Sequence, residues 1–122
     1  MRFLALLFAA LLAGGAAASA PAAAQSTNGC QGFSGHWLTT WPGGTTKMHI
    51  VGNKALYSYH GGILTGHVEG GVYSGTYAQS DGNTGTFRFV LSEGGNHFSG
   101  WYSPQSSPDQ RVTWTGVCEG PP

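Results

Sequence analysis

A five-residue phrase recurs along this chain: an apolar residue, Ser or Thr, Gly, any residue, and a second apolar residue. Because side chains alternate between the two faces of a β-strand, the apolar positions and the glycine share one face, while the Ser or Thr lies on the other. The phrase therefore predicts repeated amphipathic strands around a common core. Its copies are Phe33–Trp37 (FSGHW), Leu64–Val68 (LTGHV), Tyr73–Tyr77 (YSGTY), Phe98–Tyr102 (FSGWY) and Trp114–Cys118 (WTGVC).

The rest of the chain alternates in the same way and has no helical periodicity after residue 24. Runs bounded by Gly, Asn, Asp and Pro divide it into about eight strands joined by short, Gly-rich hairpin turns. Such a series most simply closes into an all-β, up-and-down antiparallel barrel, because closure removes the exposed sheet edges. The expected strands cover residues 33–41, 45–51, 54–60, 63–69, 72–79, 84–92, 96–103 and 110–118.

One face of these strands collects every aromatic residue after residue 24 except Trp101. Register decides which face is enclosed, so we expect this face inside and the Ser, Thr and His side chains of the other face outside. Residues expected inside are Phe33, Trp37, Trp41, Met48, Ile50, Tyr57, Tyr59, Leu64, Val68, Tyr73, Tyr77, Phe87, Phe89, Leu91, Phe98, Tyr102, Val112 and Trp114.

The N-terminal segment, residues 1–24, resembles a secretory signal peptide. It has a basic Arg2, an apolar run over residues 3–12 and a small-residue cleavage site at Ala22–Ala24. We therefore expect a single barrel domain over residues 25–122, periplasmic or secreted. The apolar run is shorter than the roughly 20 residues that a membrane span needs, and balanced charge leaves no basic footprint for nucleic acid.

Cys30 and Cys118 bracket the repeats. A lone pair of cysteines in an exported domain usually forms a disulfide, and closing so long a loop removes about 4–5 kcal/mol of unfolded-state entropy in the chain model. A free redox pair is the alternative, although no neighbouring residue would lower either thiol pKa. We expect the disulfide to join the two ends of the domain.

The inward aromatic residues near one end of the barrel form the candidate ligand site. The disulfide should lie at the opposite end, whereas this end carries the longer connections, where ligands enter small barrels. The alternative is that the rings simply fill the interior. The candidate residues are Trp41, Tyr59, Tyr77, Tyr102 and Trp114.

The residues give little support for a metal site, a cofactor, catalysis or a membrane-spanning barrel. Four of the five histidines fall on the outer face without convergent spacing, and His60 alone lies at the open end, so we expect no metal site. We expect no cofactor and no catalytic residues, because the chain lacks a nucleophile paired with a base and lacks a nucleotide-binding fingerprint. A membrane-spanning barrel is disfavoured, since several strands fall short of about 9–11 residues.

Three segments resemble repeated phrases of the avidin and streptavidin family. Phe33–Trp37 is similar to its Thr-Gly-Thr-Trp phrase, Tyr73–Tyr77 to Thr-Gly-Thr-Tyr, and Phe98–Tyr102 followed by Arg111–Trp114 to its last hairpin. The resemblance implies an exported eight-stranded barrel of the avidin or lipocalin kind, with Tyr77 and Trp114 in positions similar to the family's barrel tyrosine and late tryptophan.

The residues that hold biotin in that family are not matched. The family places an Asn two residues after the first Trp and a Ser in the following turn, where this chain has Thr39 and Gly43. Apolar enclosure alone does not satisfy a polar ureido group, so tight biotin binding is not expected.

The leading hypothesis is a binding module with a small or carbohydrate-like ligand at the open end. The alternative is a protein-binding barrel, such as an inhibitor of an exported hydrolase, that uses its loops and an exposed Trp101. A small-barrel cyclase or isomerase is the third hypothesis. The sequence is compatible with an oligomer.

Overall fold

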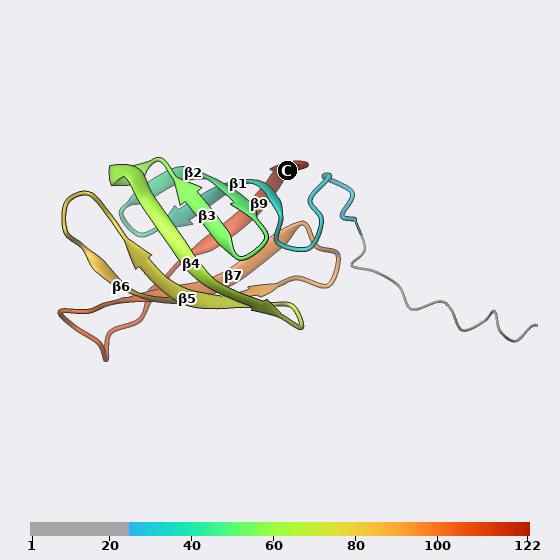
Figure 1. Ribbon diagram of the computed structural model, residues 1–122. Coiled ribbons are helices and arrows are strands. Elements are labelled where there is room, and N and C mark those ends of the chain that lie inside the picture. Colours follow the sequence, from blue (N-terminus) through green and yellow to red (C-terminus); the bar gives the residue numbers. More distant parts are fainter. Residues whose placement is uncertain (1–24) are drawn as a thin grey trace, which may run out of the picture.

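Amphipathic strands joined by short turns form a closed antiparallel barrel in the computed structural model, which describes residues 25–122 (Figure 1). The expected signal peptide, residues 1–24, lies outside the described residues. No helix in the described part of the chain is long and apolar enough to cross a membrane. The strands are β1 (Gly35–Trp41), β2 (Gly44–Val51), β3 (Lys54–Tyr57), β4 (Gly62–Glu69), β5 (Val72–Ala78), β6 (Thr84–Leu91), β7 (His97–Pro104), β8 (Val112–Thr113) and β9 (Thr115–Gly120).

The barrel closes through its last strand. Strands β1 to β7 each pair with the next strand along the chain, β7 with β8 included, and β9 pairs with β1 on one side and with β7 on the other. Strands β8 and β9 are two halves of one strand interrupted at Trp114, whose backbone N–H donates to the Gly100 carbonyl at 2.9 Å. The predicted eight-stranded up-and-down barrel is confirmed.

Two of the expected strand boundaries are wrong. Strand β3 ends at Tyr57, not at residue 60, because the chain turns into the 3₁₀ segment η2 (Tyr59–Gly61), in which His60 has a φ of 50°. The expected last strand, 110–118, is divided at Trp114. Both irregularities lie toward the end of the barrel where the candidate site was expected.

Aromatic rings fill the middle and one end of the barrel. The Trp37 indole is fully buried, packs 5.0 Å from the Phe98 ring between centroids, and donates from Nε1 to the Phe33 carbonyl at 2.8 Å. The Phe89 and Phe98 rings stack at 4.2 Å. The inward face predicted from strand alternation is therefore the core. Its buried members are Cys30, Phe33, Trp37, Met48, Ile50, Ala55, Tyr57, Leu64, Tyr73, Tyr77, Phe87, Phe89, Phe98, Trp114 and Cys118.

Two residues expected inside are exposed. Tyr59 is 44% exposed because it belongs to η2 and not to a strand. Val68 is 39% exposed because it lies beyond the end of β3, whose pairing with β4 stops at Thr65. No neighbouring strand covers the β4–β5 hairpin on that side, so the alternation continues there without burial.

The Cys30–Cys118 disulfide is confirmed and is buried at one end of the barrel, which we call the closed end. It joins the segment before β1 to β9 across 88 residues. Polar contacts reinforce this junction: the Ser26 hydroxyl accepts from the Cys30 backbone N–H at 2.9 Å, and the Asn28 amide donates to the Cys118 carbonyl at 3.0 Å.

Removal of the disulfide should destabilise the fold strongly. The double variant Cys30→Ala/Cys118→Ala is expected to lose about 2–5 kcal/mol of unfolding free energy, because the unfolded chain regains the freedom of a long loop. Urea denaturation of the oxidised wild type and the variant measures the loss. An unchanged midpoint would mean that the loop is already restricted in the unfolded chain.

Strands β4 and β5, which pair in antiparallel register, approach each other very closely where Gly66 lies opposite Gly75. A Cβ on Gly66 would lie 1.9 Å from the Ser74 carbonyl oxygen, and backbone cannot move aside as a side chain can. Gly66→Ala should therefore cost about 1–3 kcal/mol or more of unfolding free energy. The control is Gly94→Ala, since a Cβ there meets nothing within 4 Å. Equal thermal stability of the two variants would contradict the close approach.

Candidate functional site

The end of the barrel opposite the disulfide, which we call the open end, carries the β1–β2 turn, η2, the β5–β6 loop and the connection over residues 105–111 (Figure 1). The loop and η2 are tied together, because the backbone N–H and the hydroxyl of Ser80 both donate to the His60 carbonyl, at 2.8 and 2.9 Å. A cavity of about 90 Å³ lies at this end, which we call the aromatic pocket. Its walls are Trp41, Thr46, Tyr57, Tyr59, Tyr77, Gln79, Asn83, Tyr102 and Trp114.

The structure brings all five predicted site residues together in the aromatic pocket. Tyr77 of β5 and Trp114, between β8 and β9, are 3% and 4% exposed and form the deepest walls. Trp41 ends β1, and Tyr102 belongs to β7; both are half-buried. Tyr59 reaches the pocket from η2 and remains at its rim.

Neighbouring rings in the pocket lie close to right angles. Tyr57 and Trp114 meet at 85° with centroids 5.4 Å apart, and Tyr102 meets Trp114 at 80° and 5.4 Å. The Tyr77 and Tyr102 rings meet at 87° and 5.6 Å. Edge-to-face pairs of this kind are favourable, and here they arrange the rings as the walls of a box.

A hydrogen bond from β2 positions Tyr59 at the rim. The Tyr59 backbone N–H donates to the Thr46 hydroxyl oxygen at 2.9 Å, and the same oxygen lies 2.9 Å from the Ser58 hydroxyl. The Tyr59 ring then packs against Trp41 at 4.9 Å and 62°. The rim is therefore held by backbone geometry as well as by ring packing.

Four wall residues were not predicted as part of the site: Thr46, Tyr57, Gln79 and Asn83. Tyr57 was expected inside but was not assigned to the open end. The alternation that turns Tyr77 inward also turns Gln79 inward two residues later, so Gln79 could have been identified from the sequence. Asn83 lies in a turn, where alternation gives no direction.

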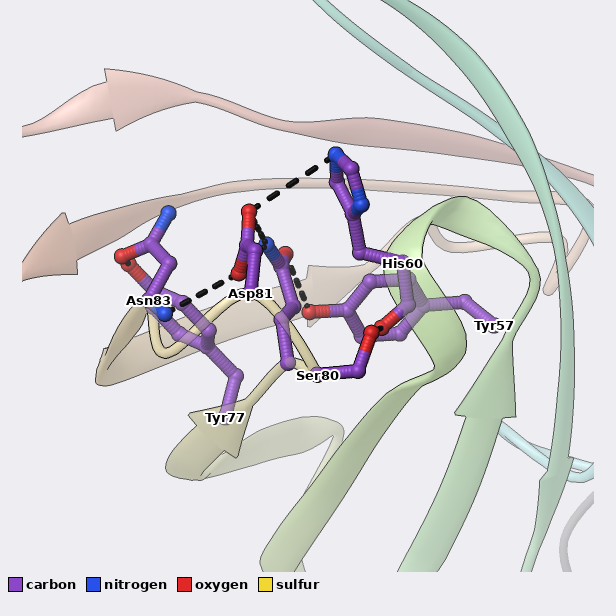
Figure 2. A network of polar contacts seen from close by, with 7 residues as sticks. Tyr57, His60, Tyr77, Ser80, Asp81 and Asn83 are labelled. Atoms are coloured by element: carbon purple, nitrogen blue, oxygen red, sulfur yellow. Dashed lines mark hydrogen bonds and ion pairs between the residues drawn. The ribbon is translucent and has the colours of Figure 1, made fainter.

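A polar network links the deep wall of the pocket to the β5–β6 loop (Figure 2). The Tyr57 hydroxyl donates to Gln79 Oε1 at 2.7 Å, and Gln79 Nε2 donates to the Asp81 carboxylate at 3.2 Å. Because Asp81 can only accept, it orients the Gln79 amide, and the oriented amide in turn draws the Tyr57 proton away from the pocket.

A second branch of the network begins at Tyr77, whose hydroxyl donates to Asn83 Oδ1 at 3.1 Å. The Asn83 backbone N–H donates to Asp81 Oδ1 at 3.0 Å, and the His60 imidazole Nε2 lies 3.6 Å from Asp81 Oδ2 (Figure 2). Asp81 thus organises both sides of the rim. The Asn83 N–H and the Gln79 amide hold the pKa of its carboxyl below the usual value.

Two phenols of the pocket, those of Tyr57 and Tyr77, remain neutral over a wide pH range. Burial, with smaller contributions from the neighbouring Tyr102 and the negative charge of Asp81, raises the pKa of Tyr77 to about 12. Burial, then the proximity of Tyr77 and of Asp81, also raises the pKa of Tyr57. The pocket therefore contains no ionised side chain near neutral pH, and the field of Asp81 reaches its walls.

One fully buried polar atom of the pocket lacks a hydrogen-bond partner among the described residues. It is Nε1 of Trp114, which is buried and can only donate. Buried donors without a partner are uncommon in folded proteins and call for an explanation.

The histidines do not gather into a metal site. No group of three or more His, Cys, Asp or Glu side chains with metal-binding geometry occurs within residues 25–122. His60 contacts Asp81 at the rim, whereas His36 and His49 stack on each other at 4.0 Å on the outer face, on adjacent strands β1 and β2.

Trp101 is not the freely exposed side chain that the protein-binding hypothesis expects. It is half-buried, because the Arg111 guanidinium lies over its ring at 3.9 Å from the centroid. The cation covers one face of the indole, an arrangement that stabilises the end of β7 against the residues just before β8.

Comparison with protein-family models, with curated proteins and with solved structures finds no match to this chain.

The raised tyrosine pKa values predict how stability depends on pH. A buried phenol keeps its proton up to a higher pH in the folded protein than in the unfolded chain, so unfolding releases protons and stability falls as pH rises from about 10 toward about 12. Tyr77→Phe removes one such proton and should show a shallower fall. Urea denaturation of both proteins between about pH 9 and about pH 11.5 measures the slopes. Parallel curves would show that Tyr77 titrates alike in both states.

Proposed function

We propose that this protein is an exported binding module, periplasmic or secreted, which holds a small or carbohydrate-like ligand in the aromatic pocket. Export is supported by the signal-like features of residues 1–24 and by the buried Cys30–Cys118 disulfide, since such bonds persist in oxidising compartments.

The observation that carries the proposal is a neutral, ring-lined hollow at the open end of a barrel that is otherwise filled. Ligand sites in small barrels lie at their mouths and combine apolar walls with a few oriented polar groups. The oriented amides of Gln79 and Asn83 and the unpartnered Trp114 Nε1 are such groups.

The resemblance to the avidin family supports the position of the site but not biotin as the ligand. Tyr77 and Trp114, the positions similar to the family's tyrosine and tryptophan, both line the pocket. Thr39, however, is fully buried, and its hydroxyl donates to the Thr46 carbonyl at 3.1 Å. It therefore offers no polar group to a ligand.

Binding is favoured over the cyclase or isomerase hypothesis by the acid–base properties of the pocket. The titratable residues in its walls are tyrosines, and burial raises the pKa of Tyr57 and Tyr77 well away from neutrality. General acid–base catalysis is efficient when the pKa lies near the working pH, so these phenols are suited to forming walls and hydrogen bonds.

One observation on the outer face of the barrel supports the protein-binding alternative. Leu56 of β3 and Ile63 of β4 lie directly opposite each other in the sheet and are 58% and 43% exposed. An exposed apolar pair can contribute to an interface, with a second copy of the chain or with another protein. It is a better candidate contact than Trp101, which Arg111 covers.

Titration of tryptophan fluorescence tests the proposal. The oxidised domain is titrated with a panel of small molecules and soluble glycans, and at least one compound should give a saturable response. Trp41→Ala should weaken that response about tenfold or more by removing a wall of the pocket, whereas Trp101→Ala, the matched control outside it, should not. Circular dichroism establishes that both variants fold. A lack of response to every compound would favour the protein-binding alternative.

A further inference from the structure

The volume of the aromatic pocket limits which part of a ligand it encloses. Its 90 Å³ corresponds to about three water molecules at liquid density, and it is smaller than the roughly 150 Å³ apolar cavity known to enclose benzene. The enclosed group therefore has about three or four non-hydrogen atoms, and the rest of the ligand extends through the mouth. A complete sugar ring with its hydroxyl groups exceeds this limit.

Aromatic rings line the cavity from several directions. Two tryptophans and four tyrosines surround the cavity, and the pairs deepest in it lie at 80–87° to one another. A flat ligand would stack on one ring only, whereas a compact, roughly spherical group contacts several rings at once. Boxes of perpendicular aromatic rings are the arrangement that favours a cation over the ring faces.

Several hydrogen-bonding groups of the walls are engaged by the protein itself. Tyr57 and Tyr77 donate to Gln79 and Asn83, and the Thr46 hydroxyl is engaged by the Tyr59 backbone and by Ser58. A primary ammonium or a guanidinium must find a new acceptor for each N–H that it buries. A quaternary ammonium has no N–H to satisfy, so it loses much less on burial.

The electrostatic field at the pocket has the sign that a cation requires. None of the nine wall residues carries a charge near neutral pH, and the carboxylate bonded to one of them, Gln79, belongs to Asp81. The negative charge of Asp81 contributes to the raised pKa of Tyr57 and of Tyr77, so its field extends to the deep walls. The imidazole of His60 lies 3.6 Å from the same carboxylate and packs edge-on against the Tyr59 ring, with centroids 4.3 Å apart.

We propose that the aromatic pocket recognises a quaternary ammonium group, such as the trimethylammonium head of a choline-like or betaine-like compound. The four heavy atoms of that head match the enclosed volume, its charge faces rings on several sides, and Asp81 supplies the counter-charge at the rim. The inference rests on the proposed function, because it names the ligand class of the same pocket.

Isothermal titration of the oxidised domain with choline and with 3,3-dimethylbutan-1-ol tests the charge directly. The two compounds have the same shape, but the second carries carbon in place of the charged nitrogen. Choline should bind about tenfold or more tightly than its neutral isostere, with NaCl used to match the ionic strength of the two titrations. Equal affinities, or no binding of choline while another compound of the panel binds, would overturn the quaternary ammonium assignment and leave the proposed function intact.

Variants that each remove one negative charge test the role of the carboxylate at the rim. Asp81→Asn keeps an acceptor for the Asn83 N–H but removes the counter-charge, so it should weaken choline several-fold and leave the isostere unchanged. Glu93→Gln, which removes a carboxylate in the β6–β7 turn at the closed end, is the matched control and should behave as the wild type. Equal loss in both variants would mean a general charge effect and would overturn the role of Asp81. If no compound of either set binds to the folded protein, the proposed function fails together with the ligand class.

Discussion

Pairing of β9 with both β1 and β7 is the constraint on which the rest of the structure depends. It turns a meander of short hairpins into a closed barrel, so that the first and last strands of the meander are paired and one face of the strands points inward. The inside of so narrow a barrel holds little besides rings, which explains why the aromatic residues gather on one face. Glycines such as Gly66 occupy places where the backbone of the neighbouring strand comes too close for a side chain.

The open end is held in place by different interactions from the core. Rings there are only partly covered, and their order comes from polar contacts that converge on a single carboxylate, that of Asp81. Exposed carboxylates contribute little to stability on their own. Here the carboxylate fixes the direction of two amides, and the amides fix the direction of two phenol protons. A carboxylate at the solvent-exposed rim thereby determines the hydrogen-bond directions of the buried wall.

The disulfide was predicted from a lone pair of cysteines in a domain expected to be exported. Strand alternation was sufficient to predict the barrel and the inward direction of Tyr77 and Trp114, because both depend on a period of two and on closure. It failed for Tyr59, since the left-handed His60 turns the chain out of β3, and for Val68, since its strand outlasts its neighbour. Neither a left-handed residue nor a strand that is longer than its neighbour produces a periodic pattern in the sequence. Arg111 packs over Trp101 because of the conformation of a loop, which sequence periodicity does not predict.

The two ends of the barrel are secured by different kinds of bond. A covalent bridge with buried sulfur atoms holds the closed end, whereas hydrogen bonds such as those from Ser80 to His60 hold the loops around the aromatic pocket. Local opening begins where the fewest strong contacts must break, so amide protons of η2 and of the β5–β6 loop should exchange with solvent before those of the barrel wall. Under the proposed function, a ligand would enter and leave by loosening one end, without loss of the barrel. While bound, it would hold together the loops of the end that has no covalent bridge.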